Sequence, residues 1–435
     1  MDPAAPHLMD EILEEIFLRL PTPAALARTS MASVSFRSII TERFFLRRYR
    51  KLHPPPLLGF VHPGGHRFPL ASPTLGCVDP RGFHPAQAPH PSAPLARAVA
   101  DGADFTYSFV PEPRDRKGRR PRYRKGWKPS DIRDGRVLLE SIESLDRFPI
   151  LAVCDPLSRR YLLLPHIPTG LAVQGKDPHE NVPILAPISD EDEDETSFKV
   201  ICVSRFDTKL VAIVFSSVTQ QWCIAASLSY PFDEYGVPSY LTGFSCLFCV
   251  RGCFYFAPAA PCLDALFVLD TQRMEFSTVV DRTGYHIQLR CMPCQEDDPL
   301  DYTVRNRPGE SRSIPFCIVE GREGALEMFS LPNNGQPSNE WQLENIIPLP
   351  GQYDYYSLGA AEGFFFLGAT TEDQLDMDNH CFAELSGTEW DVDYFSLEVQ
   401  TSKLTKVCRR RSQFFNWEHV YWYFGFPPSL SKPSI

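Results

Sequence analysis

The stretch VCDPLSRRYLLLP, residues 153–165, places a short apolar run on each side of a polar turn, and this arrangement recurs along the chain. Similar stretches lie at residues 214–223, 268–277 and 396–407, and a degenerate copy lies at 328–350. Short apolar runs separated by polar turn residues are typical of β-hairpins. The pattern therefore predicts short antiparallel strands over most of the chain, from residue 131 to residue 426.

The spacing of these hairpins indicates how the strands are arranged. Successive copies lie roughly 55–70 residues apart, and further hairpin-like segments, such as residues 252–256 and 363–368, precede them. Four short strands per repeat at such a period favour the blades of a β-propeller. The predicted fold is a small N-terminal module of three helices followed by a large all-β domain, a β-propeller of undetermined blade number. An irregular β-sandwich is the alternative.

A helical module precedes the strands and covers residues 7–52. Apolar residues follow two adjacent stripes of its first helix: Leu8, Ile12 and Ile16 on one, and Met9, Leu13, Phe17 and Leu20 on the other. Pro21 ends this helix, Thr22 and Pro23 begin a second, and Ser30 is the expected cap of a third. So short a module has too little apolar surface to fold alone, so part of this surface is expected to meet a partner.

The remaining segments complete the predicted organisation. Residues 53–130 form a proline-rich and basic connection in which residues 57–61 are the one strand, and no helix is expected over residues 53–98. A basic run at 112–130 and an acidic run at 190–195 are expected to be exposed loops or insertions. The aromatic segment 414–424 is expected to complete the core, with strand 57–61 as its mate. Residues 427–435 form a tail.

Composition limits the classes of function. The 435 residues carry a net charge of -11, which argues against nucleic-acid binding because that function needs a basic surface. The N-terminus lacks the basic and apolar regions of a signal peptide, and no apolar run has the length of a membrane span. We expect an intracellular protein, cytoplasmic or nuclear, whose 13 cysteines are reduced.

No constellation of residues predicts a catalytic, cofactor or metal site. Cys291 and Cys294 form a lone CxxC without the second pair that structural zinc requires. Nucleotide-binding glycine loops and the Gly-x-Ser-x-Gly motif are absent from the sequence. The remaining candidates are expected to be buried core thiols (Cys246, Cys249 and Cys253) and solvated loop histidines (His62, His66, His84 and His90).

The N-terminal module resembles the F-box. The resemblance rests on Asp10-Glu11, Ile12-Leu13, Ile16-Phe17, Arg19-Leu20-Pro21, Phe36-Arg37 and Ile39-Ile40. Met9, Ser33 and Val34 depart from the usual F-box residues. The remainder is similar to the large group of plant, especially grass, F-box proteins, through residues 53–60, 134–139, 154–165 and 424–430.

This resemblance implies a function without catalysis. F-box proteins are substrate receptors of SCF ubiquitin ligases, in which the box binds a Skp-type adaptor, and through it a cullin-RING ligase, while the C-terminal domain binds a protein substrate. The expected adaptor-facing or box-core residues are Leu8, Met9, Ile12, Leu13, Ile16, Leu20, Leu26 and Phe36. A scaffold that binds the adaptor without promoting degradation is the first alternative, and a β-propeller enzyme with an appended box is the second.

Overall fold

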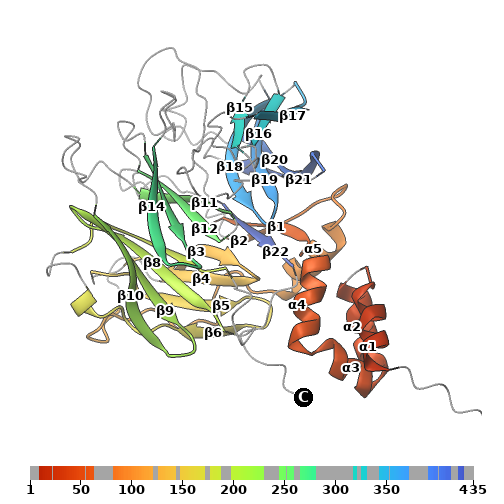
Figure 1. Cartoon of the computed structure of the whole chain (residues 1–435), viewed down its shortest axis with the longest axis horizontal. Helices are drawn as coiled ribbons and strands as arrows, with labels where there is room; N and C mark the ends of the chain where they lie inside the picture. The colour runs from red at the N-terminus through yellow and green to blue at the C-terminus, as the bar shows by residue number, and fades with distance from the viewer. Residues whose placement is uncertain are drawn as a thin grey trace, which may run out of the picture.

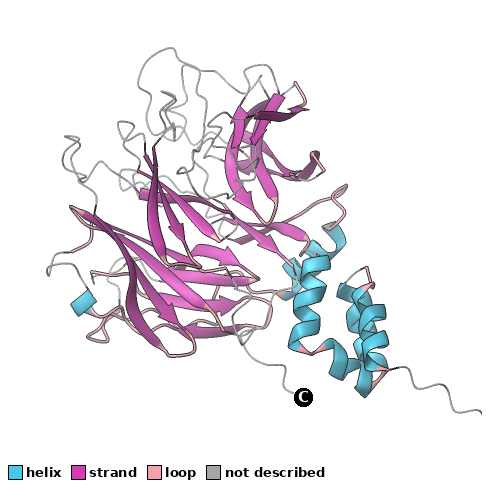
Figure 2. Ribbon diagram, in the orientation of Figure 1, coloured by secondary structure: helices cyan, strands magenta, loops and turns pink. Residues whose placement is uncertain are grey.

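The structure is a computed structural model, and it describes the residue ranges given next. The described residues are 9–21, 23–53, 55–62, 82–120, 126–143, 147–171, 177–187, 197–229, 244–250, 252–258, 265–280, 317–320, 325–330, 342–351, 353–371, 390–399, 401–412 and 420–425. The α-helices gather at one side of the molecule, and antiparallel sheets with one short 3-10 turn form the rest of the described chain (Figure 2). The predicted order, a helical module followed by a large all-β domain, is confirmed.

The N-terminal module contains four helices, so the expected count of three is not confirmed. They are α1 (Asp10–Leu18), α2 (Pro23–Ala32), α3 (Val34–Ile40) and α4 (Arg43–Leu52). Ser30 lies inside α2, so it does not cap the third helix. The break between α2 and α3 falls at Ser33, where the backbone is extended and the side-chain oxygen accepts a hydrogen bond from the amide of Ser35 at 3.2 Å. A second break at Glu42, also extended, separates α4 from α3.

Five antiparallel sheets follow one another along the chain and form the blades of a β-propeller (Figure 1). The first blade holds β3 (Trp127–Arg133), β4 (Arg136–Ser141), β5 (Leu151–Asp155) and β6 (Arg160–Leu163), and a 3-10 turn, Thr169–Leu171, follows it. The second holds β7 (Glu180–Leu185), β8 (Lys199–Arg205), β9 (Lys209–Ser216) and β10 (Gln221–Ser229).

The other three blades have the same order of strands. The third holds β11 (Phe244–Val250), β12 (Cys253–Pro258), β13 (Ala265–Asp270) and β14 (Glu275–Val280). The fourth holds β15 (Cys317–Glu320), β16 (Ala325–Ser330) and β17 (Gln342–Pro348). The fifth holds β18 (Tyr353–Ala361), β19 (Phe364–Thr371), β20 (Trp390–Glu398) and β21 (Lys403–Ser412). Each strand pairs with the next one in the chain, as in up-and-down blades.

The predicted hairpins are confirmed, and each forms the last two strands of a blade. Their turns share one construction. The side chains of Asp155, Ser216 and Asp270, each at the end of a strand, accept hydrogen bonds from amides two and three residues later. The residue before the last strand has a positive φ in the first, second, third and fifth blades, at Arg159, Gln220, Met274 and Ser402, while the residue before β17 lies outside the described part of the chain. The recurring sequence motif is therefore a recurring turn geometry.

A further three-stranded sheet joins the two ends of the β domain, and it is called the closing sheet here. Its central strand β1 (Leu57–His62) pairs with β2 (Gly82–Pro85) on one side and with β22 (Tyr421–Phe424) on the other. Figure 1 shows β22, from the end of the chain, beside β1. The predicted pairing of the aromatic segment with strand 57–61 is confirmed.

Aromatic packing ties the closing sheet to the fifth blade. The indole of Trp422 stacks on the ring of Phe366, with centroids 3.7 Å apart and planes at 11°. Phe60 lies 4.5 Å from the Tyr394 ring and 5.3 Å from that of Trp422. These rings are among the buried residues of one core that also includes the first blade. The closing sheet thus connects the first and last blades.

The connecting segment 53–130 contains more regular structure than expected. β1 and β2 belong to the closing sheet, and α5 (Ala93–Gly102) forms where no helix was expected, because Pro94 lies in its first turn, where a missing amide hydrogen costs little. The same packing buries His62 and His90, so these two are not solvated loop residues, and His84 lies in β2.

The remaining expectations have mixed outcomes. The thiols of Cys249 and Cys253 are only partly buried. Burial still raises the pKa of Cys249 to about 11. Within the basic run, residues 112–120 lie in a loop, but residues 127–130 belong to β3. Several residues named in the sequence analysis lie outside what the structure describes: the side chain of Cys246, and the residues Leu8, His66, Cys291, Cys294, 190–195 and 413–419.

A substitution at Gly59 tests how closely β1 and β2 approach each other in the closing sheet. Its φ is +146°, and a Cβ there would lie 2.1 Å from the carbonyl oxygen of His84 on β2. Gly59→Ala should therefore lower the free energy of unfolding by about 2 kcal/mol or more, measured by denaturant titration. The matched variant Gly170→Ala, with nothing within 4 Å of the new methyl group, should change it by less than about 0.5 kcal/mol. Equal stability of the two variants would contradict the described close approach.

Candidate functional site

The helical module has a core of its own. Leu13 and Phe17 of α1 pack with Leu26 of α2 and with apolar residues of α3 and α4. The buried members are Leu13, Phe17, Leu18, Leu26, Ile40, Phe45 and Tyr49, with Leu20, Phe36, Ile39 and Leu46 partly buried against them. The module therefore uses one side of α1 for its internal packing.

Polar contacts hold α1 against α4. The guanidinium of Arg48 donates hydrogen bonds to the carboxylates of Glu14 at 2.6 Å and Glu15 at 2.5 Å. The Tyr49 hydroxyl donates to the carbonyl of Leu20 at 3.0 Å, and the His53 Nε2 lies 2.7 Å from the carbonyl of Leu18. The last two contacts engage backbone carbonyls at the C-terminal end of α1 that have no partner within the helix. Together with the Arg48 contacts, they hold α1 in one orientation against α4.

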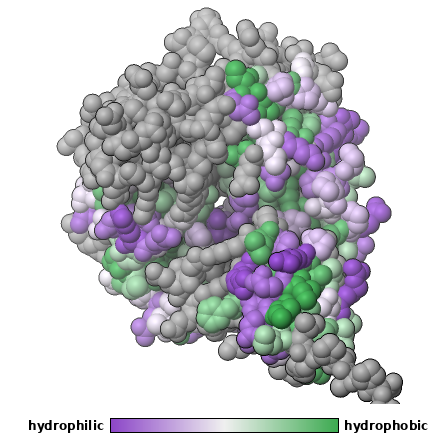
Figure 3. Space-filling view, turned by 45° about the vertical axis from the view of Figure 1, so that its right-hand side comes forward, coloured by the Kyte–Doolittle hydropathy of each residue, from purple (hydrophilic) through white to green (hydrophobic). Residues whose placement is uncertain are grey.

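The outward side of α1 carries a row of exposed apolar residues beside its exposed acidic ones. The side chains of Met9, Ile12 and Ile16 are 65%, 43% and 45% exposed. Their spacing of three and four residues places them on one side of a helix, and we call these three residues the α1 stripe. Figure 3 shows apolar residues gathered among hydrophilic ones on the helical module, which this view brings forward. A single exposed apolar residue is ordinary, but a row of three indicates a contact surface.

The structure divides the eight residues expected to bind an adaptor or to form the core of the module. The α1 stripe faces solvent, Leu13 and Leu26 are buried, and Leu20 and Phe36 pack on the core from partly exposed positions. Leu8 lies outside the described residues. Helical spacing placed Met9 on the stripe of Leu13 and Phe17, but the structure exposes Met9 with Ile12 and Ile16, so this assignment was wrong. Only the packing against α3 and α4 shows that Leu13 and Phe17 are internal.

Further exposed apolar side chains were missed by the sequence reasoning. Met31 lies in the last turn of α2, Val34 begins α3, and Phe44 lies in the first turn of α4, and all three are largely exposed. Each stands beside a break between helices, where helical periodicity is interrupted and gives no signal. One sequence signal for an unusual position was available at Val34, because this residue departs from the one usual in F-box sequences.

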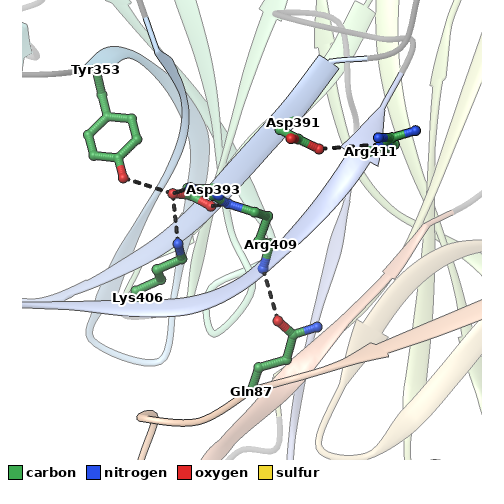
Figure 4. A network of polar contacts seen from close by, with 7 residues as sticks. All are labelled: Gln87, Tyr353, Asp391, Asp393, Lys406, Arg409 and Arg411. Atoms are coloured by element: carbon green, nitrogen blue, oxygen red, sulfur yellow. Dashed lines mark hydrogen bonds and ion pairs between the residues drawn. The ribbon is translucent and has the colours of Figure 1, made fainter.

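The propeller holds a buried polar network on the fifth blade (Figure 4). The Asp393 carboxylate accepts two hydrogen bonds from Arg409, at 2.5 and 2.8 Å, one from the Tyr353 hydroxyl at 2.9 Å, and lies 2.7 Å from the Lys406 ammonium. Burial alone would raise the pKa of Asp393, but these partners outweigh it and lower the pKa. The backbone amide of Arg409 also donates to Gln87. The Asp393 carboxylate is thus bound by side chains of β18 and β21, and the network joins these strands to β20.

Polar side chains also connect the inner strands of the first two blades. Asp131 on β3 accepts a hydrogen bond from the amide of Leu185 on β7 at 2.8 Å, and Arg133 donates to the carbonyl of the same residue at 3.2 Å. Burial raises the pKa of Asp131. Within the described part of the chain, no three His, Cys, Asp or Glu side chains gather as metal ligands, and no helix is long and apolar enough to cross a membrane.

Comparison with known proteins assigns no family. No protein-family model matches the chain, and no curated protein matches it. Solved structures with some likeness include a prolyl endopeptidase, at TM-score 0.26 and 11% identity, covering 64% of this chain and 36% of that one. The Aleuria aurantia lectin has a TM-score of 0.27 and 10% identity, over 64% of this chain and 75% of the lectin.

A third solved structure is the Bombyx mori GH32 β-fructofuranosidase. It has a TM-score of 0.24 and 12% identity, and the likeness covers 68% of this chain and 73% of the enzyme. Likeness at these TM-scores and identities carries no functional argument. The helical module and its exposed stripe are therefore the features on which a functional proposal rests.

The Asp393 network makes acid stability dependent on one carboxylate. Because the folded-state pKa of Asp393 is lowered, its ionised form contributes stability above the unfolded pKa of about 4, and this contribution is lost as the pH falls below it. Asp393→Asn should lower the unfolding free energy at pH 7 by about 3 kcal/mol and make its fall between pH 5 and pH 3 shallower, measured by denaturant unfolding.

The control for this prediction is Asp391→Asn on the same strand. Asp391 is exposed and lies 3.6 Å from Arg411, so its loss should cost less than about 1 kcal/mol. An unchanged pH dependence in Asp393→Asn would show that the network does not set acid stability.

Proposed function

We propose that the protein is a substrate receptor of an SCF-type ubiquitin ligase, in which the helical module docks a Skp-type adaptor. The observation that carries this proposal is the α1 stripe of Met9, Ile12 and Ile16, which is exposed although the module already has a complete core on the other side of the helix. An amphipathic helix that presents anchors at such spacing suits a partner's apolar groove. The F-box resemblance at Ile12 and Ile16 supports the choice of adaptor, although Met9 departs from the usual F-box residue.

The mechanism proposed is proximity. The helical module holds the chain on the ligase, and the propeller raises the concentration of a bound protein substrate near the charged ubiquitin carrier. No catalytic group of this chain takes part in the transfer. The segment between α4 and β1 is only four residues, 53–56, so the module and the propeller are joined by a short connection.

The direct test is an adaptor pull-down with Ile16→Asp. A carboxylate placed in a desolvated apolar contact should cost about 2 kcal/mol or more, so adaptor binding should be lost. Ile16 is exposed in the free chain, so the variant should unfold at the same denaturant concentration as the wild type. This separates it from Leu13→Asp, which should also fail to bind, but through unfolding of the module, because Leu13 is buried.

Ile346→Asp provides the matched control. Ile346 lies on β17 and is as exposed as the residues of the α1 stripe, so the same change there should leave adaptor binding intact. Retained binding by Ile16→Asp would remove the α1 stripe as the docking surface and, with it, the support for the receptor proposal.

A further inference from the structure

The outer strand of the first blade has backbone groups without a partner strand. β6 is the last strand of its sheet, and Figure 1 shows it at the rim of the propeller. The amide of Leu164 donates to the carbonyl of Leu151 at 3.0 Å, and the register pairs Leu162 with Val153. In an antiparallel ladder, hydrogen-bonded pairs of residues alternate with pairs that are not hydrogen-bonded. Leu162 and Leu164 belong to hydrogen-bonded pairs with β5, so the N–H and C=O groups of Tyr161 and Leu163 point away from β5.

The side chains at these two positions make the same edge apolar. Tyr161 is 43% exposed and Leu163 is 44% exposed, and both project on one face because they are two residues apart. Their cross-strand neighbours on β5, Cys154 and Ala152, are fully buried. The ring of Phe109 lies 6.5 Å from that of Tyr161 and widens the apolar strip. The core of the blade thus continues to an open edge.

Positive charges stand at both ends of β6. Arg159 and Arg160 are exposed at its start. At its other end the loop of residues 112–120 is attached through Arg116, whose guanidinium donates a hydrogen bond to the carbonyl of Ile167. Exposed Arg114 and Lys117 belong to this loop, and no carboxylate of the described residues lies within ion-pair distance of either.

The carboxylates of this region are occupied by local contacts. Asp115 binds the amides of Lys117 and Arg119 and the Arg119 guanidinium, and it shapes the basic loop. Asp155 caps its turn, and Asp104 accepts hydrogen bonds from Thr106 and Ser108. The edge is therefore locally basic although the chain has a net charge of -11.

The corresponding edge of the fifth blade differs. There the amide of Gln87 donates to the carbonyl of Val407 on β21 at 2.7 Å, so a segment of the chain already binds that outer strand. The basic residues of β21 include Lys406 and Arg409, which pair with Asp393. By contrast, no hydrogen bond among the described residues uses the outward groups of β6. Of the cations beside it, Arg159 lies near Asp104 and lowers the pKa of that carboxyl.

We propose that β6 binds an extended acidic segment of a protein partner, which adds to the first blade as a fifth strand. The outward backbone groups of Tyr161 and Leu163 would form the ladder, their side chains would take apolar residues at alternate positions, and the flanking Arg and Lys residues would pair with carboxylates. Cations at a strand edge oppose pairing with basic strands and favour acidic ones. The inference goes beyond the receptor function and does not depend on it.

The test uses the full chain and a synthetic peptide, fluorescein-labelled EEVEIEVEE, followed by fluorescence anisotropy at low salt. The acidic peptide should bind, and the charge-reversed peptide KKVKIKVKK should not. Leu163→Pro removes one outward amide hydrogen while the bonds to β5 remain, a change that an edge strand tolerates, and it should weaken binding about tenfold or more. Leu163→Ala, which keeps the amide, should weaken it less.

Arg160→Glu provides a second, independent variant. It leaves the backbone unchanged and should lower both the affinity and its dependence on salt concentration. Unfolding midpoints of the variants verify that the blade is intact. Equal affinity of the wild type, Leu163→Pro and Arg160→Glu for the acidic peptide would overturn the proposal. Absence of binding to the wild type, or equal binding of the two peptides, would overturn it as well.

Discussion

The antiparallel pairing of β22 with β1 is the contact on which the rest of the structure depends. It joins residues 421–424 to residues 57–61, so the ends of the β domain lie in one sheet between the first and fifth blades. A row of blades without this pairing would leave the apolar faces of its two terminal blades open. The shared core shows the consequence, because it includes residues of the closing sheet, the first blade and the fifth blade. Trp422, stacked on Phe366, links two of these parts directly.

Closure of the ring also determines the position of the helical module. Since β1 is held between β2 and β22, the residues before it belong to none of the sheets and must bury their apolar side chains among themselves. Four short helices achieve this with one face of α1, and the contacts of Arg48 and His53 hold that face inward. The opposite face, with Ile12 and Ile16, stays exposed. The docking proposal therefore follows from how the chain divides its apolar residues.

Much of the β domain could be predicted from sequence because its determinants are local. Each hairpin combines two apolar runs with a polar turn, and in the first three blades the first residue of this turn caps the following amides, as Asp155 and Asp270 do. Such signals lie within about ten residues. The closing sheet was only partly predicted, because β2 is a short strand that forms by pairing with β1, about twenty residues earlier in the chain. Burial of His62 and His90 depends on the same long-range packing. In the helical module, spacing separated Ile12 and Ile16 from Leu13 and Phe17 but placed Met9 on the wrong stripe, and the choice of the internal stripe depended on α3 and α4.

Hydrogen exchange of the full chain with and without a Skp-type adaptor tests the central claim most directly. Amides of α1 exchange through openings of the helix, and a partner seated on the α1 stripe opposes these openings. The account predicts slower exchange for residues 10–18 in the presence of the adaptor, with the blade strands β3 to β21 unchanged. Unchanged exchange in α1, or protection confined to the propeller, would contradict it.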